Sequence, residues 1–209
     1  AGTPYVTINH WGKKGYITRC AYDQNWVEFI PLGTTPNTPP TASFTVSPTT
    51  GTVATLFTVD ATASSDAQDG ANLQYRWDWD NDGTYDTAFS TTKTATHTWA
   101  STGTKTIKLE VKDSGGLTAT TTKTVTINNT APVASFTVTP TTGTKTTVFT
   151  VDASASYDLE GAVTVRWDWE NDGVWDTAYS STKTATKTYS TIGTKTIKLE
   201  VRDAAGLTA

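Results

Sequence analysis

The chain repeats itself at a spacing of about 90 residues, and this internal repeat limits its fold more than any other sequence feature. Residues 103–111 return unchanged as 193–201, and residues 76–79 return at the same offset. An earlier segment, 42–46, returns at a slightly larger offset. The difference falls in residues 67–70, which have the composition of a loop, where an insertion or deletion does least harm. Two copies of one structural unit are therefore expected.

Each copy has the pattern of short β-strands separated by turns. Aromatic and charged residues alternate over 75–80, and aliphatic and charged residues alternate over 107–112. Because side chains of a strand point alternately to its two faces, Trp77 and its counterpart Trp167 are predicted to be buried and the charged residues to face solvent. Residues 120–127 are predicted to form the last strand of the first copy. No segment shows a helical stripe, so the predicted class is all-β: two tandem immunoglobulin-like sandwiches without paired cysteines.

Composition narrows the class of protein further. Threonine, a β-branched residue favoured in strands, is abundant throughout the chain. The net charge of −4 argues against a nucleic-acid partner, and no apolar run reaches the ~20 residues that span a bilayer. The absence of Met at position 1 indicates removal of a leader or a fragment of a longer protein. Cys20 is the single cysteine, which excludes an internal disulfide; pairing with another chain and a buried free thiol both remain open.

Three regions are predicted. Residues 1–38 form an aromatic-rich segment followed by a Pro-rich linker, residues 39–129 the first sandwich, and residues 130–209 the second, whose last strand is missing. Residues 1–35 are too few for an independent core, so they are expected to anchor on a partner surface: the first repeat, another chain or a further domain. The linker at 128–132 is short, which predicts a semi-rigid rod.

Residues 77–83, Trp-Asp-Trp-Asp-Asn-Asp-Gly, resemble the Trp-Asp-Phe-Gly-Asp-Gly signature of the polycystic kidney disease (PKD) domain. The flanking segments 60–66 and 102–116 are similar to the family as well, and the resemblance extends over residues 41–209 in both repeats. It implies a sandwich module of secreted and cell-surface proteins that acts as a spacer, an adhesion unit or a binder of substrate surfaces and is not an enzyme. Trp79 and the pair Asp80-Asn81 depart from the signature and lengthen its turn.

Carboxylates two residues apart around a glycine turn match the first half of a calcium-binding loop. The candidate metal ligands are Asp78, Asp80, Asp82 and Asp86 in the first repeat and Asp168, Glu170, Asp172 and Asp176 in the second. The match ends at Phe89, where a calcium loop has its closing glutamate. Solvated turn carboxylates are therefore the alternative to calcium. A second set of candidate ligands lies in the loop that differs in length: Asp66, Asp69, Asp158 and Glu160.

The remaining candidates for catalysis or ligand binding have weaker support in the sequence. His97 becomes Lys187 in the second repeat, which excludes a catalytic role shared by both copies. Tyr85 and Trp175 correspond to each other and could stack on sugar rings or cap the sandwich core. Asn128 begins a glycosylation sequon. No catalytic residue is predicted.

The predicted function is a non-enzymatic extracellular rod that spaces or connects on a surface or filament, with a protein partner or a second copy bound through residues 1–35. The alternative is an accessory module of a secreted hydrolase that binds polysaccharide or collagen; an enzyme with its site in residues 1–38 is the least favoured class. Residues 5–9 resemble the strand 124–128 that the second repeat lacks. They could complete the second repeat of a neighbouring copy by strand addition, whereas a truncated chain with a chance match is the simpler account.

Overall fold

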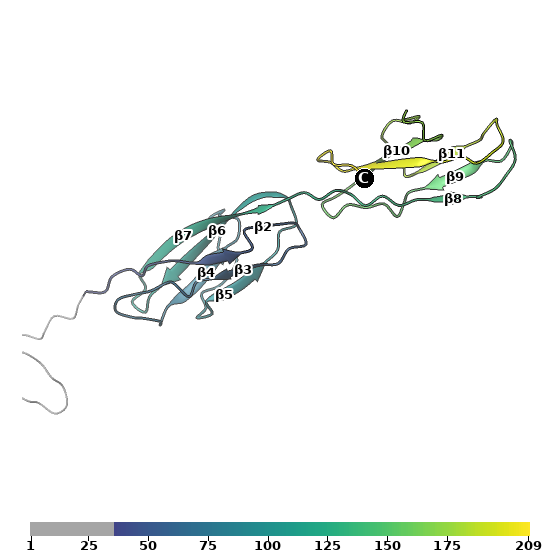
Figure 1. Cartoon of the computed structure of the whole chain (residues 1–209). Helices are drawn as coiled ribbons and strands as arrows, with labels where there is room; N and C mark the ends of the chain where they lie inside the picture. Colours follow the sequence, from purple (N-terminus) through teal and green to yellow (C-terminus); the bar gives the residue numbers. More distant parts are fainter. Residues whose placement is uncertain (1–35) are drawn as a thin grey trace, which may run out of the picture.

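The structure, a computed structural model, describes residues 36–209, and these form two β-sandwiches (Figure 1). The described residues contain strands and turns and no α-helix, which confirms the all-β prediction. Predictions that concern residues 1–35, including those on Cys20 and the anchoring segment, lie outside the described residues. No helix within 36–209 is long and apolar enough to cross a membrane.

The first repeat holds strands β1 to β7 in two facing sheets. Its strands are β1 (Thr45–Ser47), β2 (Thr50–Gly51), β3 (Phe57–Asp60), β4 (Gln74–Asp78), β5 (Thr94–His97), β6 (Gly103–Lys112) and β7 (Thr118–Ile127). One sheet has the order β1-β3-β5 and the other β2-β7-β6-β4. Neighbouring strands are antiparallel except that β2 runs parallel to the end of β7. The last strand begins two residues before the predicted 120–127.

The second repeat, as described, has the same two sheets with fewer strands. Its strands are β8 (Thr137–Thr139), β9 (Phe149–Asp152), β10 (Thr164–Asp168), β11 (Thr184–Lys187) and β12 (Lys198–Arg202). One sheet has the order β8-β9-β11 and the other pairs β10 with β12. Counterparts of β2 and β7 are not among these described strands.

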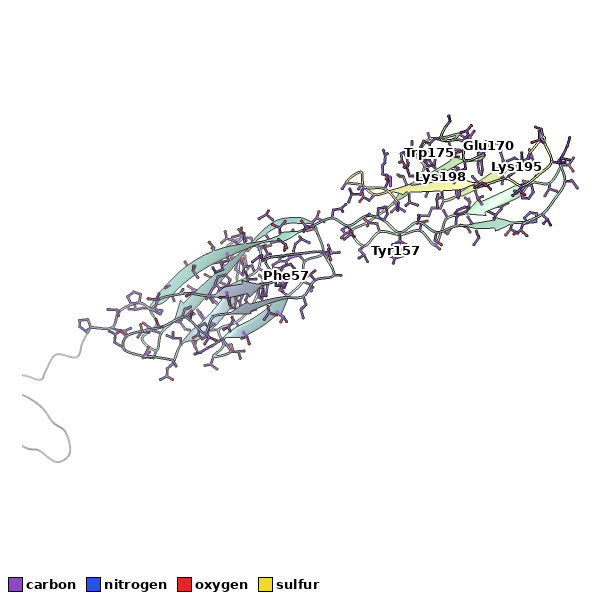
Figure 2. All side chains as sticks on the ribbon, viewed as in Figure 1. Phe57, Tyr157, Glu170, Trp175, Lys195 and Lys198 are labelled. Atoms are coloured by element: carbon purple, nitrogen blue, oxygen red, sulfur yellow. The ribbon has the colours of Figure 1, made fainter. Side chains whose placement is uncertain are left out.

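The two cores contain the predicted residues. Trp77 and Trp167 are each 2% exposed, which confirms the alternation argument. Trp77 lies opposite Leu109 on β6, and the ring of Phe44 meets it edge-on at 5.1 Å. Phe57, labelled in Figure 2, is buried in the same core. Each of these large side chains contributes about 1.5–3 kcal/mol through the apolar surface that it removes from water.

The outer face of the β4–β6 pair is less open than the alternation predicts. Glu110 was expected to face solvent, but it is only 8% exposed and forms an ion pair with Arg76 on the neighbouring strand. Arg166 and Glu200 repeat this pair. The long arginine side chain covers the carboxylate, so this position is buried although it lies on the outer face.

An open groove of about 640 Å³ runs along the second repeat. Thr142 and Gly143, which line it, are the counterparts of the β2 residues that pair with β7 in the first repeat. Phe136, Phe149 and Ile197 also line it and are half-buried. In the first repeat, β7 fills the equivalent space with Val125 and Ile127, which are 1% and 2% exposed. The groove therefore lies where a β7-like strand would pack.

Candidate functional site

The turn after β4 gathers three carboxylates in the first repeat. Asn81 and Gly83 have positive φ angles of 57° and 94°, which fold the chain sharply back after the strand. As a result, Asp78, Asp80 and Asp86 each place a carboxylate oxygen within 4.8 Å of the others. We call these three residues the first turn cluster. Asp82, the fourth predicted ligand, lies outside the cluster, and its Oδ1 accepts a hydrogen bond from the Thr84 N–H at 2.6 Å.

Asp78 is the buried member of this cluster. Strand alternation predicted an outward side chain, and this is wrong: Asp78 has no solvent exposure, because it ends β4 and the following turn folds over it. Its Oδ2 accepts a hydrogen bond from the Gly83 N–H at 3.2 Å. Its Oδ1 has no hydrogen-bond partner among the described residues. A buried carboxylate oxygen in this state is costly, so it calls for a cation or another donor.

The second repeat builds a similar cluster from Asp168, Glu170 and Asp176, which we call the second turn cluster. Asp172 lies outside it and accepts a hydrogen bond from the Val174 N–H at 2.8 Å. Here both oxygens of the buried aspartate accept hydrogen bonds from backbone N–H groups. Those N–H groups belong to Glu170, Asp172 and Gly173, at 3.0–3.3 Å. Burial would raise the pKa of Asp168, but these donors hold the pKa below its usual value.

Position 97 and its counterpart distinguish the two clusters. His97 stacks flat on Trp79, with ring centroids 4.7 Å apart. Burial lowers the pKa of His97 below 6.5, although the carboxylates of Asp86 and Asp80 oppose this effect. Lys187 instead places its Nζ 3.6 Å from Glu170 Oε1 and above the ring of Trp169. The second turn cluster thus has a permanent positive charge at a position where the first has an imidazole.

The loops next to the linkers hold the other predicted carboxylates. Hydrogen bonds from the backbone N–H and hydroxyl of Ser114 lower the pKa of Asp69. Asp66 Oδ2 has no hydrogen-bond partner among the described residues. In the second repeat, burial raises the pKa of Asp158, and the neighbouring carboxyl groups of Glu160 and Asp203 raise it further. The structure therefore brings the predicted loop acids together in this repeat.

Sequence reasoning missed two buried aspartates near these loops. Asp113 and Asp203 are 3% and 5% exposed, and each accepts a hydrogen bond from an asparagine of the preceding linker. Asn37 Nδ2 lies 2.8 Å from Asp113 Oδ2, and Asn129 Nδ2 lies 2.6 Å from Asp203 Oδ2. The sequence signal for these contacts is an Asn-Thr pair, which precedes both repeats.

The candidate sugar-stacking rings lie on the outer face of the sheet and are in contact with cations. The Arg76 guanidinium lies 3.7 Å from the centre of the Tyr85 ring, and Arg166 lies 4.3 Å from that of Trp175. Lys198 also approaches Trp175, on the same side of the second repeat in Figure 2. Both rings are half-buried. One face of each ring is therefore used by a cation–π contact and is closed to a sugar.

Comparison with known proteins agrees with the repeat structure. Residues 37–128 and 129–209 each match the family described as PKD domain. Among solved structures, the PKD1 domain of Vibrio anguillarum Epp is 25% identical over 44% of this chain and 96% of its own, with a TM-score of 0.35. The PKD1 domain of the Vibrio cholerae metalloprotease PrtV is 23% identical over 44% of this chain and 99% of its own, also with a TM-score of 0.35.

A third similar structure comes from a study of the promiscuous specificity of carbohydrate-binding modules of the β-sandwich superfamily. It is 17% identical over 80% of this chain and 85% of its own, with a TM-score of 0.39. No curated protein matches the chain.

Proposed function

Because the chain belongs to the PKD domain family, we propose that its two repeats form a non-catalytic, extracellular connecting rod that holds other parts of a surface or filament at a fixed spacing. The observation that carries this proposal is the joint between the repeats. Asn128 donates its N–H to the carbonyl of Gly51 in the first repeat at 2.7 Å. The next two residues, Asn129 and Thr130, donate to Asp203 and Glu160 in the second. No residue between these anchors is left as a flexible spacer.

The same anchoring precedes the first repeat. Asn37 donates to Asp113, and the hydroxyl of Thr38 donates to Gln68 at 2.8 Å. Each repeat thus holds the last residues of the segment that enters it. A repeat of this kind transmits orientation from one neighbour to the next, which is what a spacer requires.

Small-angle X-ray scattering tests the rod. The comparison is between the native chain and a variant with Gly-Ser-Gly-Ser inserted between Asn128 and Asn129. Both proteins carry the same residues 1–35, so a difference in scattering reports on the joint alone. We expect the insertion to raise the flexible signal at high angle and to broaden the distribution of sizes. Equal flexibility in the two proteins would contradict the rod.

The partner of the rod is proposed to be a second copy of this chain, bound through residues 5–9. A strand that adds to a sandwich presents apolar side chains two residues apart, as Val125 and Ile127 do in β7 of the first repeat. Residues 5–9 carry Val6 and Ile8 at the same spacing. Main-chain pairing with a sheet edge of the neighbouring copy would hold such a strand in place. Repeated head-to-tail contacts of this kind build a filament.

The mass of the chain in solution tests this contact. Light scattering should find oligomers for the native chain and a monomer after removal of residues 1–12. A Val6→Lys and Ile8→Lys variant should behave like the truncated protein, whereas Thr3→Lys should not. If the native chain is a monomer over the full concentration range, or if the truncated chain still assembles, residues 5–9 do not mediate the contact.

A second candidate function is an accessory module of a secreted hydrolase that binds polysaccharide or collagen. The feature in its favour is the pair of aromatic side chains, Tyr85 and Trp175, at corresponding positions of both repeats. Co-sedimentation with insoluble polysaccharides and with collagen fibrils tests it. Binding that is lost in a Tyr85→Ala and Trp175→Ala double variant supports this function, and no sedimentation of the native chain removes it.

A further inference from the structure

The first turn cluster has the features of a cation site whose negative charges are not balanced by a cationic side chain among the described residues. Its three carboxylates, from Asp78, Asp80 and Asp86, present oxygens within 4.8 Å of one another. Like charges this close repel and favour a bound cation. Asp78 adds an independent observation: its side chain is fully buried, and Oδ1 has no hydrogen-bond partner among residues 36–209. Asp78 is a member of the cluster, so a bound ion could satisfy its unpartnered oxygen.

The second turn cluster shows how the same turn is satisfied without an ion. Lys187 places its ammonium 3.6 Å from Glu170. Both oxygens of Asp168 accept hydrogen bonds from backbone N–H groups of the turn. The nearest equivalent of the lysine in the first repeat is His97, whose imidazole lies flat against Trp79. Among the described residues, no ion pair joins His97 or another cationic side chain to the carboxylates of the first turn cluster.

We propose that the first turn cluster binds one calcium ion through Asp78, Asp80 and Asp86, and that Lys187 replaces this ion in the second repeat. Calcium suits the ligands because it takes six to eight oxygens in a flexible arrangement, and carboxylates can offer two each. The two exposed carboxylates, of Asp80 and Asp86, give the ion access from solvent. The calcium proposal does not rest on the rod. The scattering experiment above tests the joint and not the turn, so the failure of one proposal can be told apart from the failure of the other.

Terbium luminescence and calorimetry of the full chain test the proposal at pH 7.5. Terbium replaces calcium at oxygen-rich sites, and Trp79, whose backbone N–H donates to Asp86 Oδ2 at 2.7 Å, is close enough to sensitise it. We expect one site per chain, with calcium displacing terbium. Asp80→Asn should weaken calcium binding at least tenfold. Asp82→Asn is the matched control outside the cluster and should bind as the native chain does.

The most direct test exchanges the residues at the two corresponding positions, His97 and Lys187. His97→Lys should abolish the calcium site, because it supplies the charge that the second repeat already has. Lys187→His should create a second calcium site, and this readout is a gain that a damaged fold cannot imitate. Circular dichroism of each variant in EDTA checks that the fold is retained.

Three results would overturn the proposal. One is the absence of calcium binding by the native chain, and another is two equivalent turn sites in it. The third is binding that survives both Asp80→Asn and His97→Lys but is lost in Glu160→Gln, which would place the ion in the loop beside the linker.

Discussion

The same nine residues, 103–111 and 193–201, take different structures in the two repeats. In the first repeat they lie in β6, which pairs with β7 along its whole length from Gly103 to Lys112. In the second they form a strand only from Lys198 onward, where β10 supplies the partner. Local propensity is identical, so the neighbouring strand decides which of these residues are strand. The comparison separates the contribution of sequence from that of context within one chain.

The burial of corresponding core side chains also differs between the two repeats. Ile107 has no solvent exposure and its counterpart Ile197 is half-buried, whereas Val111 and Val201 both have none. Phe44 is 2% exposed and its counterpart Phe136 is half-buried beside the groove. The core side chains whose exposure differs between the repeats therefore lie at the end of the sandwich that β7 covers in the first repeat. Four predictions test this difference between the two repeats.

The largest expected effect comes from the two core tryptophans. Trp77→Ala should lower the free energy of unfolding of the first repeat by about 3–5 kcal/mol, because it leaves a cavity in a closed core. Trp167→Ala should lower that of the second by about 1 kcal/mol less, since a cavity next to an open groove can collapse. Urea denaturation, with hydrogen exchange read separately for each repeat by mass spectrometry, measures both. Equal losses would show that the groove does not soften the second core.

A smaller effect is expected from the strand that distinguishes the repeats. Ile127→Ala removes an apolar side chain of β7 from the first core and should lower the free energy of unfolding by about 2–4 kcal/mol. Because β7 then packs less well, the amide hydrogens of residues 103–107 should exchange faster while those of 108–112 change little. Thr122→Ala, at an exposed position of the same strand, is the control. Uniform exchange along β6 would mean that β7 does not set its length.

The sequence predicted those parts of the fold that depend on alternation within one strand. Trp77 and Trp167 are buried because a strand of five residues fixes which face each side chain takes. The same rule failed at Asp78, where the strand ends and the turn encloses the outward side. It gave no hint that Asp113 or Asp203 would anchor a linker, because those contacts join residues more than 70 positions apart. Contacts that depend on how loops meet require the folded chain.

The outer faces of the two repeats give a third comparison. Tyr179 donates its hydroxyl to Glu200, whereas the counterpart in the first repeat is Phe89, which has no hydroxyl. Burial alone would raise the pKa of Glu200, but hydrogen bonds from Tyr179 and Arg166 hold it below 4.5. The resulting stability is present above pH 4.5 and is lost as the pH falls through the lowered value.

Tyr179→Phe should therefore destabilise the second repeat by about 1 kcal/mol at pH 7 and by much less at pH 3. Urea midpoints at the two pH values measure this difference, with Phe89→Tyr in the first repeat as the reciprocal gain. A loss of equal size at both pH values would assign the effect to packing of the ring rather than to the charged hydrogen bond.

The smallest effect concerns the joint. Burial would raise the pKa of Asp203, but the amide of Asn129 and backbone N–H groups that include that of Leu207 hold the pKa below 3.8. A carboxylate with a lowered pKa stabilises the native state above pH 3.8, and this contribution disappears as the pH falls through its value in the folded protein.

Asn129→Ala removes one donor and moves the pKa of Asp203 back up. The variant should therefore unfold at slightly lower urea than the native chain at pH 7, and the two should converge near pH 2. Asn72→Ala, at an exposed position, is the control. A difference that persists undiminished at pH 2 would show that Asn129 holds the linker by shape and not through the charge of Asp203.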